Sequence, residues 1–385
     1  MKKSNNQIGV VILGGHIQGY GIARIFGEEG IPSVVIDHHK FNITKQSRYC
    51  KKSFVADYDN TIGLLISMAK SGEYSNWLLF PTDDYYVRLL SINKDMLEDH
   101  YMVTVDSWDV IELFFNKRLS YPLAESVDIP IPKTLYPNSL DELHNSLSKM
   151  SYPCIIKPAI MKDFYSIFKQ KVLVCGSQEE LVEKYKRAIS HIDPHELMIQ
   201  EIIPGSSEHQ YSVGVLHIGG ECINHLVARR RRQHPLDFGN ATTYAETVDE
   251  PILFQYAKSL LSKANFTGLC EVEFKFDTRD GKYKFLEVNP RLWKWHLIAK
   301  QAKVPLLMSI YSYLTKHHAI ITSGYSKAAW KDVITDLPVV IQMKHKHVFT
   351  KTDTRKTIHA VWNIADPQPF ILQILMLPYL FITRR

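Results

Sequence analysis

The spacing of apolar and polar residues divides the chain into segments with different predicted structures. Residues 8–13 (IGVVIL) form a continuous apolar run, as expected of a strand that is buried on both faces. A helix-like stretch (YGIARIFGEEG) and a second apolar run (SVVID) follow, so the start of the chain predicts a β-α-β unit with Gly14 and Gly15 in its first turn. Another strand is predicted within residues 77–84 (WLLFPTDD).

The pattern changes near Asn116. The run NKRLSYPLAESVDIPIPKT predicts a helix followed by an extended segment that is interrupted by prolines, which is typical of a domain entry. From about residue 150 to 310 strand-like patterns dominate, and helices are expected near 179–190 and 252–264.

Residues 268–291 (GLCEVEFKFDTRDGKYKFLEVNPR) predict a β-hairpin, because two alternating segments flank a turn rich in Asp and Gly. Alternation places Glu271 and Glu273 on one face of the first strand, and Glu287 and Asn289 on one face of the second. Glu273, Glu287 and Asn289 can therefore point to one place, as an all-oxygen cluster suited to Mg2+, and Arg291 adds a cation for a phosphate or a carboxylate. The alternative is a hairpin whose charges face solvent.

Composition narrows the choice of function. The 385 residues are enough for two or three domains, and 45% hydrophobic and 22% charged residues are ordinary for a soluble protein. The net charge of +6 is too diffuse to indicate nucleic-acid binding. The five scattered cysteines form no C-x-x-C pair, which favours a reducing cytoplasm over a zinc site or a disulfide framework. No stretch is apolar and long enough to span a membrane.

The glycine turn leaves an oxidoreductase as one alternative. Gly14, Gly15, Gly19 and Gly21 do not have the G-x-G-x-x-G spacing of a dinucleotide-binding loop, and no hydride-transfer site is evident. The turn can instead bring backbone N–H groups close to an anionic group, with contacts from His16 and Gln18. His16 can equally be a turn residue without a special role.

Several residues between the glycine turn and the hairpin have the chemistry of a nucleotide site. Lys157 ends an apolar strand (PCIIKP), where its ammonium group is free for a phosphate oxygen. In the segment LMIQEIIPG, Glu201 can accept from an adenine amine and Ile203 can pack on the ring. Taken singly, each of these features is more often structural.

In their order along the chain these segments resemble the ATP-grasp superfamily. The resemblance rests on Lys117, I-I-K-P at 155–158, Q-E-I-I-P-G at 200–205 and E-V-E-F…L-E-V-N-P-R at 271–291, and covers roughly residues 8–315. FPTDD, RRRRQHP…GNATTYAET and E-V-N-P-R-L-W look most like the branch of D-aspartate ligase and carbamoyl-phosphate-synthase-like carboxylate–amine ligases.

This resemblance implies a chain of the α/β and α+β classes. Residues 1–115 would form a Rossmann-like domain, and residues 116–317 an ATP-grasp domain in which two α+β subdomains clasp ATP. Its small lid subdomain would span about 130–200 and its core subdomain about 201–317, and residues 318–385 would be a C-terminal extension.

The resemblance also implies roles for single residues. The ATP ligands would be Lys117, Lys157, Gln200, Glu201, Ile203, Glu208 and His209. The metal ligands would be Glu273, Glu287 and Asn289, holding two Mg2+ ions or Mn2+ in their place, and Arg291 would act with Lys157 at the transferred phosphoryl group. The phosphate loop of the family is usually rich in glycine, but residues 159–174 contain none.

The substrates are expected in a cleft between the first domain and the ATP-grasp core, because ligands bind at the strand ends of open α/β sheets. The residues expected to line it are His16, Gln18, Asp83, Asp84, Arg230, Arg232 and Thr243. The aspartates would suit a cationic amine and the arginines an anionic group. Asp83 and Asp84 can equally cap the helix that follows them.

The function that follows is an ATP-dependent carboxylate–amine ligase, which forms an acyl-phosphate and then an amide from small-molecule substrates such as an amino acid and a cell-wall or glycan-linked amine. The alternatives are an NAD(P)-dependent oxidoreductase and a non-catalytic ATP-binding module. The tail FILQILMLPYLFI, preceded by basic residues, suggests either a peripheral membrane contact or a helix that packs on the core or forms a homodimer.

Overall fold

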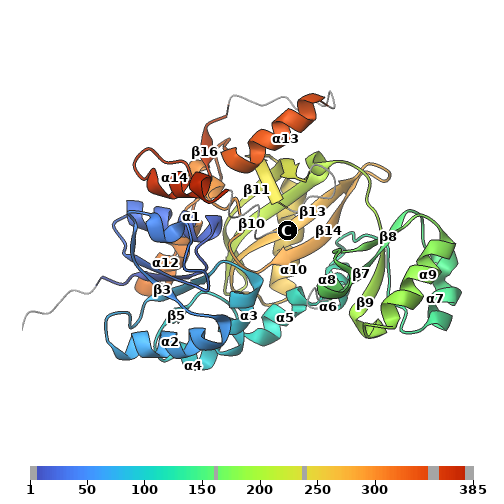
Figure 1. The fold of residues 1–385 in the computed structure, drawn as a ribbon, viewed down its shortest axis with the longest axis horizontal. Helices are drawn as coiled ribbons and strands as arrows, with labels where there is room; N and C mark the ends of the chain where they lie inside the picture. Colours follow the sequence, from blue (N-terminus) through green and yellow to red (C-terminus); the bar gives the residue numbers. More distant parts are fainter. Residues whose placement is uncertain (1–6, 160–163, 236–240, 346–354, 378–385) are drawn as a thin grey trace, which may run out of the picture.

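The computed structural model describes residues 7–159, 164–235, 241–345 and 355–377. Within these ranges the strands form three sheets, with strand orders β3-β2-β1-β4-β5, β6-β9-β7-β8 and β14-β13-β10-β11-β12-β15-β16. Figure 1 shows the first sheet and its helices on one side of the long core sheet, and the small lid sheet on the other side.

The first sheet is parallel throughout, as the continuous apolar runs predict. Its strands are β1 (Val10–Leu13), β2 (Ser33–Asp37), β3 (Cys50–Val55), β4 (Leu78–Pro81) and β5 (Met102–Val103). The elements around it are α1 (Ile17–Glu28), η1 (Thr44–Gln46), α2 (Tyr58–Lys70), α3 (Asp84–Ile92), α4 (Lys94–Glu98) and α5 (Trp108–Phe115).

The turn after β1 depends on glycine. Gly14 has a φ of +100°, and a Cβ on Gly19 would lie 2.2 Å from the carbonyl oxygen of Gly14. The carboxylate of Asp37, at the end of β2, accepts from the N–H of Gly15 at 2.6 Å and so fixes the turn from the neighbouring strand. α1 therefore begins close to the carboxyl edge of the sheet.

α6 (Lys117–Glu125) leads from the first sheet to the lid. The lid is an antiparallel sheet of β6 (Thr134–Leu135), β7 (Cys154–Pro158), β8 (Leu173–Cys175) and β9 (Leu197–Glu201). The elements around it are α7 (Leu140–Ser146), η2 (Leu147–Lys149), α8 (Phe164–Phe168), α9 (Gln178–Ile189) and η3 (Pro194–Glu196). The phosphate loop of the sequence analysis lies between β7 and β8, and its residues 160–163 are outside the described ranges.

The core sheet is built from long antiparallel strands. It contains β10 (Gln210–Ile218), β11 (Glu221–His234), β12 (Ala241–Thr247), β13 (Gly268–Asp277) and β14 (Lys282–Asn289), and η4 (Ser207–His209) precedes it. On one face it buries Val213, Val215, Val272 and Phe274 in the same core as Leu253, Ala257 and Leu260 of α10 (Pro251–Lys263). The opposite face of β13 and β14 presents polar side chains.

The residues after 317 are part of this architecture. β15 (Ala329–Lys331) pairs with β12, and β16 (Thr357–His359) pairs with β15, so both extend the core sheet. The helices of this half are α11 (Ile298–Gln301), α12 (Leu306–Lys316), α13 (Val333–His345) and α14 (Gln368–Leu375). Asp366, just before α14, binds Ser47 and the N–H of Arg48 in the first domain. None of the helices in the described ranges has the length and apolarity needed to cross a membrane.

Candidate active site

Four polar side chains of the β13–β14 hairpin lie together on one face of the core sheet. Glu271 is opposite Asn289, and Glu273 is opposite Glu287, in the antiparallel register. The amide nitrogen of Asn289 donates to Glu271 at 3.1 Å and to Glu273 at 2.9 Å. We call these four residues the acidic cluster. The structure thus brings together the three expected metal ligands, and adds Glu271, whose shared face the alternation predicted.

A β-bulge next to Glu287 makes this arrangement. The register shifts between Glu273 and Phe274, so that Glu273 lies opposite Glu287 while Phe274 lies opposite Phe285. Leu286 is therefore the extra residue of β14. Phe285 is fully buried beside Phe274, and Glu287 stays on the polar face with Glu273. Bulges of this kind commonly redirect a side chain next to a functional site.

Among the described residues, three cationic side chains contact the acidic cluster. The ammonium group of Lys117, in the first turn of α6, lies 3.0 Å from Glu287. Arg230 of β11 lies 3.4 Å from Glu273. Arg291 donates to Asp84 of α3 at 2.5 Å and to the amide oxygen of Asn289 at 3.4 Å, so that it connects the first domain to the hairpin.

Burial and charge give the carboxylates of the acidic cluster different pKa values. The charge of Lys117 lowers the pKa of Glu287 to about 2, although burial acts in the opposite direction. Burial, and then the charge of Glu273, raises the pKa of Glu271 well above its usual range. Burial also raises the pKa of Glu273, against the effect of Arg230. Glu271 and Glu273 therefore form a buried carboxylate pair that an added cation would stabilise.

The acidic cluster fits part of a Mg2+ coordination shell. The Oε1 atom of Glu271 is buried and has no hydrogen-bond partner among the described residues. Within the same ranges, no three His, Cys, Asp or Glu side chains converge closely enough to hold a metal unaided. At nucleotide sites Mg2+ is usually bound by one or two carboxylates, with phosphate oxygens and waters as the other ligands. The residues present therefore suit a metal that arrives with a nucleotide.

Lys157 reaches toward the hairpin from β7 of the lid. Its ammonium group donates to the hydroxyl of Tyr121 at 3.0 Å and to the amide oxygen of Gln200 at 2.8 Å. The Tyr121 hydroxyl donates to the carbonyl of Leu286, the bulge residue, at 3.1 Å. Sequence reasoning missed Tyr121, and the only available signal was its position one helical turn after Lys117.

Glu201, expected to accept from an adenine amine, has its carboxylate bound within the protein. It accepts from the N–H of Lys133 at 2.8 Å and from Arg279 at 2.7 Å. A base amine would have to compete with Arg279 for this side chain. Ile203 is buried two residues further on, where it can still pack on a ring.

Glu208 and His209, expected at the ribose, lie in η4. Glu208 is 3.5 Å from Arg231. The Nδ1 atom of His209 is buried and has no hydrogen-bond partner among the described residues.

The carboxyl edge of the first sheet lies next to Arg291. Asp83 is the N-cap of α3 and accepts from the N–H of Tyr86 at 2.9 Å, so the capping alternative is correct for this residue. Burial raises the pKa of Asp83, while Arg291 and His16 act to lower it. His16 is the N-cap position of α1, and Gln18 follows in the first turn. The structure thus places His16, Asp83 and Asp84 at one edge.

Two expected substrate residues have a different role. Arg232 makes a bidentate ion pair with Asp336 of α13, at 2.7 and 2.9 Å, and stacks on Tyr244. Thr243 donates to the same carboxylate at 2.9 Å. Arg232 and Thr243 are almost fully buried, so neither side chain is accessible to a substrate. Of the expected substrate arginines, Arg230 alone points to the acidic cluster.

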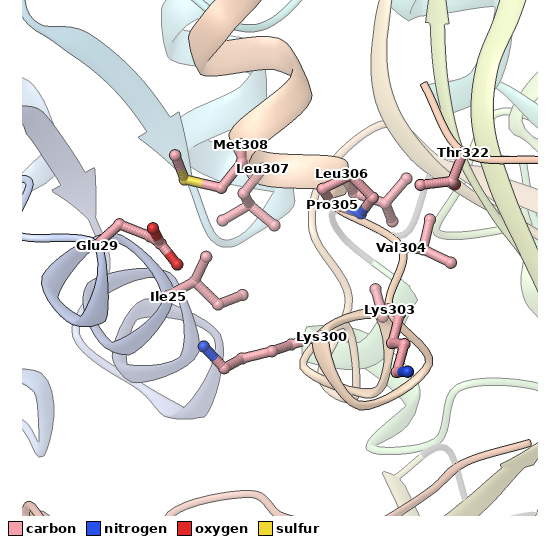
Figure 2. A pocket seen from close by; sticks show the side chains of 11 residues that line it. Ile25, Glu29, Lys300, Lys303, Val304, Pro305, Leu306, Leu307, Met308 and Thr322 are labelled. Carbon is pink, nitrogen blue, oxygen red and sulfur yellow. The ribbon is translucent and has the colours of Figure 1, made fainter. Parts of the chain in front are cut away.

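The two described hollows lie away from the acidic cluster. One, of about 220 Å3, is lined by Ile25 of α1, by Glu29 directly after this helix and by residues of the segment 299–308, which face each other across it in Figure 2. The other, of about 630 Å3, is lined by residues that include His225, Phe254 and Tyr325. Neither is lined by a residue expected at the nucleotide site, and neither suggests a function by itself.

Comparisons with known proteins identify the family of the chain. Residues 116–310, half of the chain, match the model of the family described as "Carbamoyl-phosphate synthase L chain, ATP binding domain". The D-aspartate ligase of Enterococcus faecium (strain Aus0004) is 24% identical over 74% of this chain and 72% of its own length. The carbamoyl phosphate synthase large chain of Clostridium acetobutylicum is 25% identical over 66% of this chain, which spans only 22% of that relative.

The fold is shared with solved structures. The ADP complex of N5-carboxyaminoimidazole ribonucleotide synthetase superposes with a TM-score of 0.66, at 18% identity, over 91% of this chain and 90% of that one. The L-amino acid ligase from Bacillus licheniformis has a TM-score of 0.60, at 12% identity, over 80% and 74%. The chain therefore belongs to the family of the carbamoyl-phosphate synthase L chain ATP-binding domain, and through it to the ATP-grasp superfamily of ATP-dependent ligases.

Proposed function

We propose that the chain is an ATP-dependent carboxylate–amine ligase that forms an acyl-phosphate and then an amide, with release of ADP and phosphate. The observation that supports this most directly is the acidic cluster with Lys117, Arg230 and Arg291 around it. An amino acid as the carboxylate, and a cell-wall or glycan-linked amine as its acceptor, are the substrates we propose.

The chemistry explains why cations are needed on both sides of the site. A carboxylate is a poor acyl donor because its leaving group would be oxide, and phosphorylation by ATP turns that oxygen into a leaving group. Lys117 and Lys157 would bind the phosphates, and Arg291 would stabilise the charge on the transferred phosphoryl group. Lys157 belongs to the lid and Lys117 to α6, so the phosphates would lie between them.

Glu273, Glu287 and Asn289 would hold Mg2+, and we add Glu271 to this set because of its unpartnered buried oxygen. The metal would neutralise phosphate charge and orient the phosphates. Two ions, or Mn2+ in their place, are part of this proposal. The nucleotide base would lie at the segment from Gln200 to Ile203.

Both substrates would approach from the first domain. His16, Gln18, Asp83 and Asp84 lie at the carboxyl edge of its sheet, and Asp84 contacts Arg291 directly. A carboxylate beside Arg291 and an amine substrate that contacts Asp83 through a positively charged group would then meet at the end of β14. Arg230, which pairs with Glu273, would be a further contact from the core sheet.

A titration of ATP with and without Mg2+ tests the proposal. Without the metal, Glu271 and Glu273 repel the triphosphate, so we expect ATP to bind at least about tenfold more weakly in EDTA than with Mg2+. NADH should not bind in the same calorimetric assay, which separates this function from the oxidoreductase alternative. Equal affinity for ATP with and without Mg2+ would contradict the metal role of the acidic cluster.

The C-terminal segment carries the surface that we propose for contact with a partner. Ile364, Ile371, Ile374 and Leu375 are exposed around α14, and a homodimer contact or a peripheral membrane contact would form there. Sedimentation equilibrium and flotation with anionic vesicles distinguish these two proposals. A monomer that does not float would remove both.

A further inference from the structure

Four aromatic rings lie in a row at the carboxyl edge of the first sheet. The centroid of Tyr85 is 3.7 Å from that of Tyr58, Tyr58 is 4.9 Å from His38, and His38 is 3.9 Å from His39. They come from three places, namely the segment directly after β2, the start of α2 and the start of α3. We call them the aromatic row. Tyr85 is 40% exposed, so its ring is accessible at the edge where ligands of such sheets bind.

Carboxylates lie beside the aromatic row. Asp57 is the N-cap of α2, Asp59 is in its first turn, and Asp83 is the N-cap of α3. Within the described part of the chain, none of these three carboxylates takes part in an ion pair. Burial, and then the charges of Asp83 and Asp37, raises the pKa of Tyr58 to about 12. Burial and the charge of Asp59 raise the pKa of Tyr85, against the charge of Arg88. The row therefore lies in a negative local field, although the chain as a whole has a net charge of +6.

The aromatic row begins beside the proposed reaction site. Tyr85 follows Asp84 in the sequence, and Asp84 accepts from Arg291, which in turn contacts Asn289 of the acidic cluster. Arg88 is a basic residue near the aromatic row, and its guanidinium group stacks on the ring of Trp108. A group that binds at the row is thus close to Arg291 without displacing an existing ion pair.

Aromatic faces next to carboxylates favour a cation. The ring quadrupole attracts an ammonium group, and the carboxylates add direct Coulomb attraction. The nitrogen that attacks an acyl-phosphate must be neutral, so a site that stabilises positive charge is unsuited to that nitrogen in its reactive form. It is suited to a second basic group of the same substrate.

Resting on the proposed ligase function, we propose that the aromatic row, with Asp57, Asp59 and Asp83, binds a second positively charged group of the amine substrate. The amine substrate is then a diamine or a basic amino acid, in which one nitrogen stays protonated at the row while the other is acylated near Arg291. Tyr85 is the residue that determines this specificity, because its ring is exposed and it directly follows Asp84, which accepts from Arg291.

The test uses the full-length chain with Mg2+ and a non-hydrolysable ATP analogue. L-lysine and cadaverine are the probes, and L-norleucine is the matched control, since it differs from L-lysine by the absence of the second ammonium group. Saturation-transfer NMR and calorimetry should show that L-lysine binds about tenfold more tightly than L-norleucine. Tyr85→Ala and Asp59→Asn should remove this preference. Tyr313→Ala, at another exposed tyrosine on α12, should keep it.

The outcomes separate this inference from the ligase function. Equal binding of L-lysine and L-norleucine, or no binding of either, would overturn the inference, and so would a preference that Tyr85→Ala leaves intact. If Mg2+-dependent ATP binding persists in those cases, the proposed ligase function stands and only the inference about the aromatic row is rejected. If the wild type does not bind ATP in the presence of Mg2+, the titration described above contradicts the proposed function itself. Unfolding temperatures of the variants show whether loss of the preference reflects loss of the fold.

Discussion

Glu273 and Glu287 lie opposite each other in one hairpin, yet their pKa values are shifted in opposite directions. Lys117 contacts Glu287 and keeps it ionised, whereas Glu273 shares its buried surroundings with Glu271 and has a raised pKa. The protein has therefore compensated one carboxylate with its own cation and left the other pair incompletely compensated. This asymmetry is what a binding site for an external cation requires.

Glu287→Gln should abolish turnover and leave the fold intact. The amide has nearly the same size, but it supplies neither the negative charge that a metal ligand would contribute nor an ionic partner for Lys117. We expect the rate of ADP release, measured with any accepted pair of substrates, to fall by about a hundredfold or more. The control is Glu98→Gln, which removes an exposed carboxylate that is paired with Lys94. Near-wild-type turnover of Glu287→Gln would contradict the metal role.

Sequence periodicity was sufficient to predict that the side chains of the acidic cluster lie together, because these residues are close in the sequence and share one hairpin. Arg232 and Thr243 were misjudged for the opposite reason. Their partner Asp336 lies about a hundred residues further on, and no local pattern indicates that α13 will bring a carboxylate to β11 and β12. Long-range pairing of this kind is outside the reach of alternation and spacing.

At the scale of elements, α6 connects the lid to the core. Lys117 and Tyr121 are four residues apart and so lie on one face of the helix. Lys117 contacts Glu287 of β14, and Tyr121 contacts both Leu286 of β14 and Lys157 of β7. The hydroxyl of Tyr121 therefore joins the lid lysine to the bulge of the core sheet.

Tyr121→Phe should weaken ATP binding without removing chemistry. Lys157 loses one of its two side-chain hydrogen bonds, and the expected effect is a rise of about three- to tenfold in KM for ATP, with a smaller change in kcat. Lys157→Ala should raise KM further. The matched control is Tyr101→Phe, which removes a buried hydroxyl bonded to the carbonyl of Leu65 in the first domain. A similar rise in KM for Tyr101→Phe would mean that the effect is only structural.

The position of the bulge in β14 is a feature of the hairpin that the sequence alone did not predict. Strict alternation along YKFLEVN puts Phe285 on the same face as Glu287 and Asn289. The structure puts Phe285 in the core instead, because Leu286 is inserted into the ladder. Hydrophobicity alone required Phe285 to be buried, but only the pairing of both strands shows where the extra residue lies. The hairpin and its polar face were predicted, and the position of the bulge was not.

At the scale of the molecule, segments that are far apart in the sequence hold the first domain against the core. Asp366 binds Ser47, the hydroxyl of Tyr311 donates to the carbonyl of Ile8 at 2.7 Å, and Lys300 pairs with Glu28. The sequence predicts residues 318–385 as a C-terminal extension, and no local pattern shows that β15 and β16 pair with the core sheet. These contacts make the proposed substrate cleft depend on the last part of the chain.

The surroundings of His296 predict that the docking of the first domain is sensitive to acid. Its Nδ1 atom bonds to the carbonyl of Trp293 at 2.8 Å, and its Nε2 atom is buried without a partner in the described ranges. The ring lies against α1, where a Cβ on Gly21 would be 2.7 Å from it. Burial lowers the pKa of His296 to about 4. A charge here would therefore be buried between the two domains.

The stability of the chain should consequently fall as the pH decreases from about 6.5 to about 4. In this window the unfolded chain binds a proton at His296 that the folded chain excludes, so the folded state loses on the order of 3 kcal/mol relative to neutral pH. Urea unfolding at pH 7.5 and pH 4.5 measures this loss, and His296→Gln should reduce the difference between the two pH values by that amount. His195→Gln is the control, because that ring is exposed and paired with Asp193. If His296→Gln and the wild type lose the same stability, the buried neutral ring is not what makes the domain interface sensitive to acid.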